Sequence, residues 1–397
     1  MAKLIEITGK AISGEWGTDD ETGTGIPVLR TTNFTNEGVV NYSDVVTRAI
    51  AKKNIAHKFL CDGDIIIEKS GGSDRQPVGR VIYYDGPDNI YLFNNFTGLL
   101  RVQNKKNWNS RYVFYALFGN YRQGGTRAFE NKTTGLHNLK LDDYINWFEI
   151  EEIPLEIQES VCTILDKIQY VIALYKQQLT KLDTLIKSRF VEMFGDMFQN
   201  TKGWSESRLE LMADLVSGIT KGRKVKDTEL QEVPYMAVSN VKDGYIDWTT
   251  VKTIMATKQE IEQYRLLPDD VLMTEGGDPD KVGRGAIIKE PLENSIHQNH
   301  IFRVRLNRKQ LLPIFFEEYL QHQRAKRYFL GCAKQTTGIA SINMTQLRAL
   351  PVLVPPLELQ QHFSAFVYQV DKLKVAVQKR LDETQMLFDS LMQQYFG

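Results

Sequence analysis

Several patterns are missing from this 397-residue chain, and each absence excludes a class of protein. Its three cysteines, Cys61, Cys162 and Cys332, are far apart and form no CxxC pair, which excludes a disulfide framework or a zinc set and predicts reduced thiols. No run of about 18 apolar residues is present, which excludes a membrane-spanning helix. The opening residues MAKLIEITGKAISG lack the apolar core of a signal peptide. We therefore expect a cytoplasmic protein without a membrane partner.

Catalytic motifs are missing as well. The GITKGRK segment lacks the spacing of a phosphate-binding loop, and the six histidines form neither HExxH nor a Ser-His-Asp pattern. No Asn-Pro-Pro-aromatic motif of amino-methyltransferases is present. Asp62, Asp64, Glu68 and Lys69 resemble a magnesium-dependent nuclease cluster, but such sites use an acid and a lysine separated by one residue, and here the two are adjacent. We interpret this segment as a strand followed by a turn, and we expect no catalytic residue, no metal site and no cofactor bound by the chain.

A net charge of zero at first argues against a nucleic-acid partner, yet the basic residues are concentrated in two stretches. Residues 101–132 contain seven basic side chains against one acid, and residues 303–334 contain eight against two. Either stretch alone could be an ordinary solvated face. Because the two stretches occupy matching places in the two halves, they favour a local phosphate-binding surface in each half.

The main signal is an internal repeat of roughly 200 residues. IPVLRTTNFTNEG from Ile26 parallels VPYMAVSNVKDG from Val233, which aligns Asn33 with Asn240. DGDIIIEKSGG parallels DDVLMTEGG, VGR occurs in both halves, and TTGLHNLKL parallels TTGIASINM. IPLEIQ and PPLELQ then follow in the same order. The preserved order indicates a duplication.

Each repeat has a globular part followed by one long helix. The globular part alternates short β-like runs with turn residues and includes one helical stretch, which predicts a mixed α/β (α+β) domain. The chain length also suggests two domains. We expect globular domains at residues 1–152 and 196–352, with long helices at residues 153–195 and 353–397.

The long helices are indicated by a first-turn proline, an acid after it and apolar residues at three- and four-residue steps. From Leu155 to Phe194 there are 40 residues, or about 60 Å at about 1.5 Å per residue. This spacing is typical of a coiled-coil seam, although a buried core helix would show it too. We expect the helices to pack on each other and on a partner through Ile157, Val161, Ile164, Ile168, Leu359, Phe363, Phe366 and Val370.

With its twofold arrangement of a globular domain and a Pro-Leu-x-x-Gln helix start, the sequence resembles a specificity (S) subunit of a type I restriction-modification system. TTGIASINMTQLRALPVLVPPLELQQ matches the family's junction closely, whereas TTGLHNLKLDDYINWFEIEEIPLEIQ has lost the double proline. The resemblance covers essentially the whole chain. It implies two target-recognition domains that each read half of a split site in double-stranded DNA, and an antiparallel pair of helices that sets their spacing. It also implies docking of two methyltransferase (M) subunits and of restriction (R) subunits, which carry S-adenosylmethionine, ATP and magnesium.

Side chains that read bases or hold phosphates should lie in polar loops. Such loops follow the predicted strands in both repeats, and ordinary turn formation is the alternative explanation for each of them. The candidate DNA-binding residues in the first repeat are Lys69, Ser70, Arg75, Gln76, Arg80, Asn94, Asn95, Arg122, Gln123, Arg127 and Lys132. Those in the second repeat are Lys281, Arg284, Gln298, Asn299, His300, Lys334 and Gln335.

Two other functions remain open from the sequence. A stand-alone sequence-specific DNA-binding scaffold or regulator could have the same architecture. A self-contained restriction or modification enzyme is a further alternative, against which the missing motifs argue.

Overall fold

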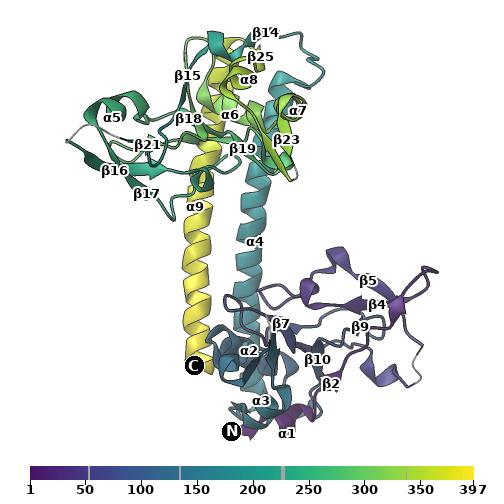
Figure 1. Ribbon diagram of the computed structural model, residues 1–397. Helices are drawn as coiled ribbons and strands as arrows, with labels where there is room; N and C mark the ends of the chain where they lie inside the picture. The colour runs from purple at the N-terminus through teal and green to yellow at the C-terminus, as the bar shows by residue number, and fades with distance from the viewer. Residues whose placement is uncertain (52–53, 134–135, 225–228, 337) are drawn as a thin grey trace. The chain divides into compact units, whose positions relative to one another are not determined.

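The computed structural model describes residues 1–51, 54–133, 136–224, 229–336 and 338–397 (Figure 1). The chain forms two compact units, which we call unit 1 (Met1–Lys176 with Lys379–Gly397) and unit 2 (Gln177–Gln378). Two 40-residue helices, α4 (Leu155–Phe194) and α9 (Leu357–Phe396), each contribute residues to both units. Among the residues described, no helix is long and apolar enough to cross a membrane.

In its described residues, unit 1 is built from four small sheets and three short α-helices besides the long ones. The central sheet has the order β2-β10-β6-β8 and is antiparallel throughout, and a second sheet, β3-β5-β4-β9, contains one parallel pair, β4 with β9. A three-stranded sheet, β11-β12-β7, and the pair β1-β13 complete the unit. Its strands are β1 (Ala2–Lys3), β2 (Ile12–Ser13), β3 (Thr18–Asp19), β4 (Ile26–Leu29), β5 (Val46–Ala49), β6 (Ile65–Glu68), β7 (Ser70–Gly72), β8 (Val81–Tyr83), β9 (Leu92–Phe93), β10 (Thr97–Leu100), β11 (Glu130–Thr133), β12 (Leu136–Leu139) and β13 (Glu149–Ile150). Its short helices are α1 (Leu4–Thr8), α2 (Ser110–Arg122) and α3 (Leu141–Trp147).

Unit 2 repeats this topology. Its central sheet has the order β15-β22-β18-β20, its second sheet β17-β16-β21 again contains one parallel pair, and β19-β24-β23 and β14-β25 match the smaller sheets. Its strands are β14 (Ser205–Arg208), β15 (Ala213–Ser217), β16 (Gln231–Met236), β17 (Lys252–Ala256), β18 (Asp270–Thr274), β19 (Gly276–Gly277), β20 (Gly285–Ile288), β21 (Ile296–His297), β22 (Ile301–Leu306), β23 (Lys334–Thr336), β24 (Ile339–Ser341) and β25 (Pro351–Val354). Its short helices are α5 (Lys258–Tyr264), α6 (Pro313–Gln321), α7 (Gln323–Cys332) and α8 (Met344–Arg348). The mixed α/β fold and the internal repeat predicted from the sequence are therefore confirmed.

Residues that align in the sequence also make matching contacts. Asn33 and Asn240 are both buried, and each accepts a hydrogen bond from the backbone N–H three residues earlier while its amide donates to two backbone carbonyls. Asp64 is paired with Arg101, and its partner in the repeat, Asp270, is paired with Arg305. A buried polar group is costly unless it is hydrogen-bonded. The matching hydrogen bonds and ion pairs therefore explain why both halves of the repeat have these residues.

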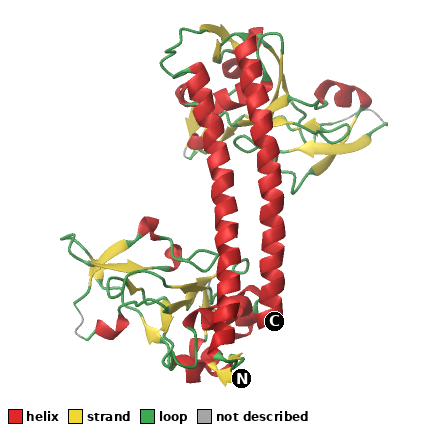
Figure 2. Ribbon diagram, turned by 180° about the vertical axis from the view of Figure 1, so that it is seen from behind, coloured by secondary structure: helices red, strands yellow, loops and turns green. Residues whose placement is uncertain are grey.

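The long helices supply part of the core of each unit. In unit 2, Phe190 and Phe194 of α4 pack with Phe315 of α6 and Phe363 of α9, with ring centroids 4.8 to 5.5 Å apart. In unit 1, the C-terminal part of α9 packs against α2, where Phe396 lies 5.1 Å from the ring of Tyr112. Within each unit the segments of α4 and α9 lie side by side and run antiparallel (Figure 2). The helices therefore belong to both hydrophobic cores.

The predicted seam along α4 was assigned partly to the wrong face. The buried face of the helix contains Gln158, Val161, Leu165 and Ile172, whereas Ile157 is 50% exposed. The face was predicted wrongly because its first buried residue is Gln158, and a pattern based on apolar residues does not include a glutamine. The spacing of apolar residues therefore predicts the presence of a helix more securely than it predicts which face of the helix is buried.

Candidate nucleic-acid interface

Three loops meet at one place in unit 1. The backbone N–H groups of Lys69 and Ser70, at the bend between β6 and β7, donate to the carbonyl of Phe96, at 2.8 and 3.2 Å. Phe96 lies in the turn between β9 and β10. The N–H of Leu139 donates to the carbonyl of Lys69 at 2.8 Å, and β12 pairs with β7. We call residues 69–76, 94–97, 130–133 and 136–139 the loop cluster of unit 1.

Unit 2 contains the corresponding cluster, formed by residues 275–284, 298–300, 334–336 and 338–342. The N–H of Glu275 donates to the carbonyl of His300 at 3.0 Å, and the N–H of Ile342 donates to the carbonyl of Glu275 at 2.8 Å. Strand β19 pairs with β24, as β7 does with β12. The repeat therefore builds the same scaffold twice, and the loops predicted to contact DNA are brought together in both units.

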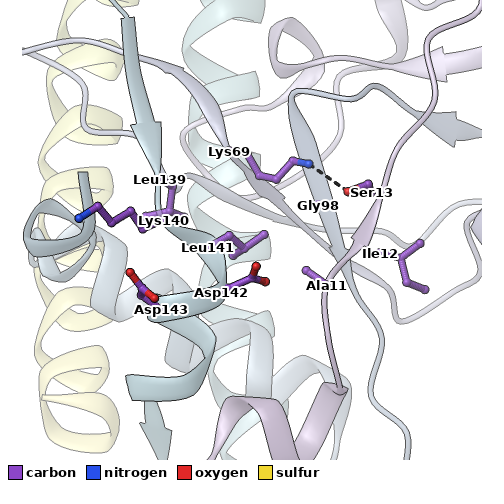
Figure 3. Close-up of a pocket in the computed structure, with 10 residues that line it drawn as sticks. All are labelled: Ala11, Ile12, Ser13, Lys69, Gly98, Leu139, Lys140, Leu141, Asp142 and Asp143. Carbon is purple, nitrogen blue, oxygen red and sulfur yellow. Dashed lines mark hydrogen bonds between the residues drawn. The ribbon is translucent and has the colours of Figure 1, made fainter. Parts of the chain in front are cut away.

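Lys69 is more enclosed than Arg75 and Lys132, the other long basic side chains of the first cluster. Its ammonium lies 3.4 Å from the Ser13 hydroxyl, at the edge of a cavity of about 420 Å³ that is also lined by Gly98, Leu141 and Asp142 (Figure 3). Burial lowers the pKa of Lys69, and the negative charge of Asp142 acts in the opposite direction. A partly desolvated lysine gains from a nearby anion, because an opposite charge favours its charged form.

The outer side chains of the first cluster are exposed. Lys132 pairs with Asp74 at 2.8 Å, and this contact is the main reason that the pKa of Asp74 lies below its ordinary value. Arg127 also faces Asp74 closely enough to lower that pKa, and Gln76 donates to the Asn36 side chain at 3.5 Å. Ser70 is half-buried, and Arg75 is exposed. These side chains can rearrange at low cost, since exposed ion pairs are weak.

Three candidates of the first repeat make contacts within the chain. Arg80 donates to the carbonyls of Phe34 and Thr31, at 2.9 and 2.8 Å, and so holds a neighbouring turn. Arg122 pairs with Asp389 at 2.7 Å, and Gln123 donates to Gln393 at 3.3 Å; both partners lie on α9. The last two candidates therefore lie against the long helix and outside the loop cluster, and their DNA contacts stay a prediction.

The turn between β9 and β10 contains both a buried and an exposed candidate. Asn94 is 4% exposed, so its side chain would reach DNA only after the turn rearranged, whereas Asn95 is exposed. The Phe96 ring, which sequence reasoning missed, is 52% exposed. Aromatic residues usually signal core in a sequence, and the signal that could have found this one is its alignment with His300, a polar residue of the other repeat.

In unit 2 the matched positions have different chemistry. His300 lies where unit 1 has Phe96, and its Nδ1 lies 2.5 Å from a carboxylate oxygen of Glu275, which stands where unit 1 has Lys69. The Asn299 amide lies 3.3 Å from Nε2 of His300. Lys281 pairs with Asp278. Arg284 and Gln298 are half-buried, and Lys334 is exposed on β23. Gln335 lies on the same strand, but its side chain is outside the described part of the structure.

In the two basic stretches fewer side chains than expected are available to bind phosphates, and the phosphate-binding surfaces stay a prediction. Most of their arginines are paired with acids from distant segments, which neutralise them locally. The pairs are Arg101–Asp64, Arg111–Asp166, Arg122–Asp389, Arg303–Asp214, Arg305–Asp270, Arg308–Asp269 and Arg324–Glu206. Other basic side chains of these stretches are exposed and do not belong to such pairs. They are Lys105, Lys106, Arg127, Lys309, Arg327 and Lys334.

The eight apolar residues predicted to dock a partner divide between two environments. Val161, Phe363 and Val370 are at most 4% exposed and belong to the interior of the units, so a partner cannot reach them. Ile157 and Ile164 are 50% and 42% exposed. Ile168, Leu359 and Phe366 are intermediate. Docking through the exposed residues stays a prediction. For the buried residues the prediction needs correction, because packing within the chain already uses those side chains.

No group of histidine, cysteine, aspartate and glutamate side chains with the arrangement of a metal site is found in the residues that the structure describes.

Comparison with known proteins supports the same architecture. The family model for the type I restriction modification DNA specificity domain matches residues 2–184 and 201–384. The chain is 26% identical over 187 residues to the MjaX specificity subunit of Methanocaldococcus jannaschii, covering 47% of this chain and 44% of that protein. It is 21% identical over 394 residues to the EcoKI specificity subunit of Escherichia coli, covering 93% of this chain and 80% of that protein.

Two solved structures have a similar fold. A type I restriction-modification S subunit from M. genitalium superimposes with a TM-score of 0.55 at 14% identity, covering 100% of this chain and 95% of that one. A chain from a structural study of type I restriction-modification complex assembly gives a TM-score of 0.57 at 16% identity, covering 100% and 96%. At these identities the two structures show the shared fold alone.

Proposed function

The chain belongs to the type I restriction-modification DNA specificity family, and from that premise we propose that each unit reads one half of a bipartite DNA site. The observation that carries this proposal is the loop cluster, which occurs once in each unit on the same backbone scaffold. As a specificity subunit the chain is non-catalytic, so its contribution to the system is DNA recognition.

The two clusters differ in the groups they would offer to DNA. Unit 1 presents Lys69 and the Phe96 ring, and unit 2 presents Glu275 and His300 at the matched positions. A lysine donates to acceptors on guanine, whereas a carboxylate accepts from the amino group of cytosine. We therefore propose that the two half-sites have different base sequences.

The long helices would set the distance between the half-sites. Each is one uninterrupted element of 40 residues that begins in one unit and ends in the other. At about 1.5 Å per residue such a helix is about 60 Å long, which is enough to place two readers about one DNA turn, roughly 34 Å, apart. On this proposal the number of unread base pairs depends on helix length.

The exposed apolar residues of the helices support a partner site. Ile157 and Ile164 of α4 and Leu373 and Leu387 of α9 are each at least 42% exposed. Exposed apolar side chains on these helices would supply apolar contacts to a partner. We propose that two methyltransferase subunits dock there, that restriction subunits join them, and that S-adenosylmethionine, ATP and magnesium bind to those partners.

Exchange of residues 197–350 for the corresponding domain of another specificity subunit tests the proposed function. The modified sites are mapped by sequencing methylated DNA from cells that express the complete system. We expect one half-site to change while the other half-site is retained. A change in both halves would contradict independent reading, and tight specific DNA binding by the chain without a methyltransferase partner would favour a stand-alone binding protein.

A further inference from the structure

One buried glutamine occupies the same place in both units, and its contacts are the same. Gln158 of α4 and Gln360 of α9 are each 0% exposed, one turn into a long helix. Both come from the Pro-Leu-x-x-Gln segment that begins each helix. A fully buried glutamine is unusual, because its amide must find partners that replace water.

In unit 1, the Gln158 side chain joins the segment that precedes α2 to the segment that precedes α4. Its Oε1 accepts from the N–H of Asn109, at 2.9 Å, and its Nε2 donates to the carbonyls of Asn107 and Ile153, at 2.9 and 2.8 Å. Asn109 is the N-cap of α2, the helix that packs on the central sheet of the unit. One side chain thus ties the start of the long helix to the start of the helix on the sheet.

In unit 2, Gln360 repeats this contact with the same spacing. Its Oε1 accepts from the N–H of Leu312, the N-cap of α6, at 2.9 Å. Its Nε2 donates to the carbonyls of Gln310 and Pro355, at 3.1 and 2.8 Å. In each unit the acceptors lie two residues before the N-cap and five residues before the glutamine.

The ion pair beside this glutamine is not shared by the units. Unit 1 pairs Arg111 of α2 with Asp166 of α4 at 2.8 Å, whereas Ile314 and Tyr368 stand at the matching positions of unit 2. The duplicated chain has therefore kept the glutamine contact while the neighbouring ion pair differs. Hydrogen bonds are directional, so the two that each glutamine makes with the segment before the neighbouring helix restrict the angle between the two helices.

We propose that Gln158 and Gln360 are positioning residues that set the angle at which each recognition domain leaves its long helix. This rests on the proposed function, in which the helices hold two half-site readers at a defined separation. The angle decides where a domain meets DNA, so each glutamine contributes to the choice of spacer length without contacting a base.

The test uses the full chain bound to its methyltransferase subunits, after the target has been mapped. Affinities are measured for duplexes with the native spacer and with spacers one base pair shorter and longer. The variants are Gln158→Glu, whose carboxylate would face the carbonyls of Asn107 and Ile153 without a donor, and Gln158→Met, which removes the hydrogen bonds without adding charge. Gln360→Glu is the matched variant in unit 2, and Gln361→Glu, at the exposed neighbouring position, is the control.

We expect the native-spacer affinity to fall about tenfold for the Gln158 and Gln360 variants, because buried groups lose their partners. We also expect their preference for the native spacer to shrink to less than about threefold, with the recognised bases unchanged and Gln361→Glu like the native chain. Equal weakening on all three spacers would overturn the proposal and leave the helix spacing intact. Unfolding of both Gln158 variants would overturn it too, since the glutamine would then support the fold itself. A native chain indifferent to spacer length would refute the proposed function instead.

Discussion

At the scale of single residues, the ion pair of Lys132 with Asp74 in the loop cluster of unit 1 can be altered by removing either its positive or its negative charge. Lys132→Ala removes a cation beside Asp74, and Asp74→Asn removes the acid that faces it. If this loop contacts phosphates, Lys132→Ala should weaken DNA binding and lower the salt slope by about one, because one fewer counterion is released. Asp74→Asn should strengthen binding. Fluorescence anisotropy at several salt concentrations measures both, and shifts in the same direction for the two variants would exclude this loop from the interface.

A second residue, Glu317, predicts a pH dependence of stability. Its carboxyl accepts from the N–H of Ile287 at 2.8 Å, and burial raises its pKa from 4.5 to about 7. The folded chain keeps the Glu317 proton to a higher pH than the unfolded chain does. The protonated carboxyl therefore adds its full contribution to the free energy of unfolding below pH 4.5, and this contribution is lost as the pH rises to about 7. It amounts to at most about 3 kcal/mol.

Glu317→Gln stays neutral at every pH and tests this dependence. The Tm of the variant relative to the native chain should therefore increase between pH 5 and pH 8 in thermal denaturation. A Tm difference that does not vary with pH would show that Glu317 is not the group that titrates.

The sequence placed polar candidates in loops that the structure brings together, but it could not separate exposed side chains from those that support the fold. Arg75 and Arg80 are both arginines of one polar segment. Arg80 nevertheless donates to two backbone carbonyls, whereas Arg75 is exposed. Gln158 was visible in the sequence as part of a helix start, but not as a buried residue. In each example the deciding partner is more than 40 residues away along the chain, where a local pattern has no information.

At the scale of elements, the end of α9 completes the core of unit 1. Met392 is 4% exposed and lies beside Gly119 of α2, whereas Met386 of the same helix is 64% exposed. Met392→Ala should destabilise unit 1 by about 2 to 4 kcal/mol through lost burial and a cavity. Met386→Ala, the matched control, should change stability by less than about 0.5 kcal/mol. Hydrogen exchange followed by mass spectrometry would show the loss, and equal effects from the two substitutions would contradict this packing.

The elements also show what a repeat can predict. Alignment of the two halves predicted matching strands, and Leu99 of β10 pairs with Ile66 of β6 as Arg303 of β22 pairs with Leu272 of β18. The bounds of the long helix, Leu155 to Phe194, also agree with its first-turn proline and terminal glycine. The packed face of the helix was missed, because polar residues that are fully hydrogen-bonded look like surface residues in a sequence.

At the scale of the whole molecule, the central claim is that helix length decides the spacing of two independently read half-sites. Seven residues inserted after Lys176 and seven after Gln378, where the two units divide, would lengthen both helices together. Seven residues are close to two turns and leave a rotation of only about 20°. They add about 10 Å, the rise of about three base pairs.

The measurement that tests this claim most directly is the methylated motif made in cells by the complete system with the lengthened chain. We predict that both half-sites keep their bases and that the gap between them grows by about three base pairs. A motif with the original gap would contradict the account, because the helices would then not set the distance between the readers.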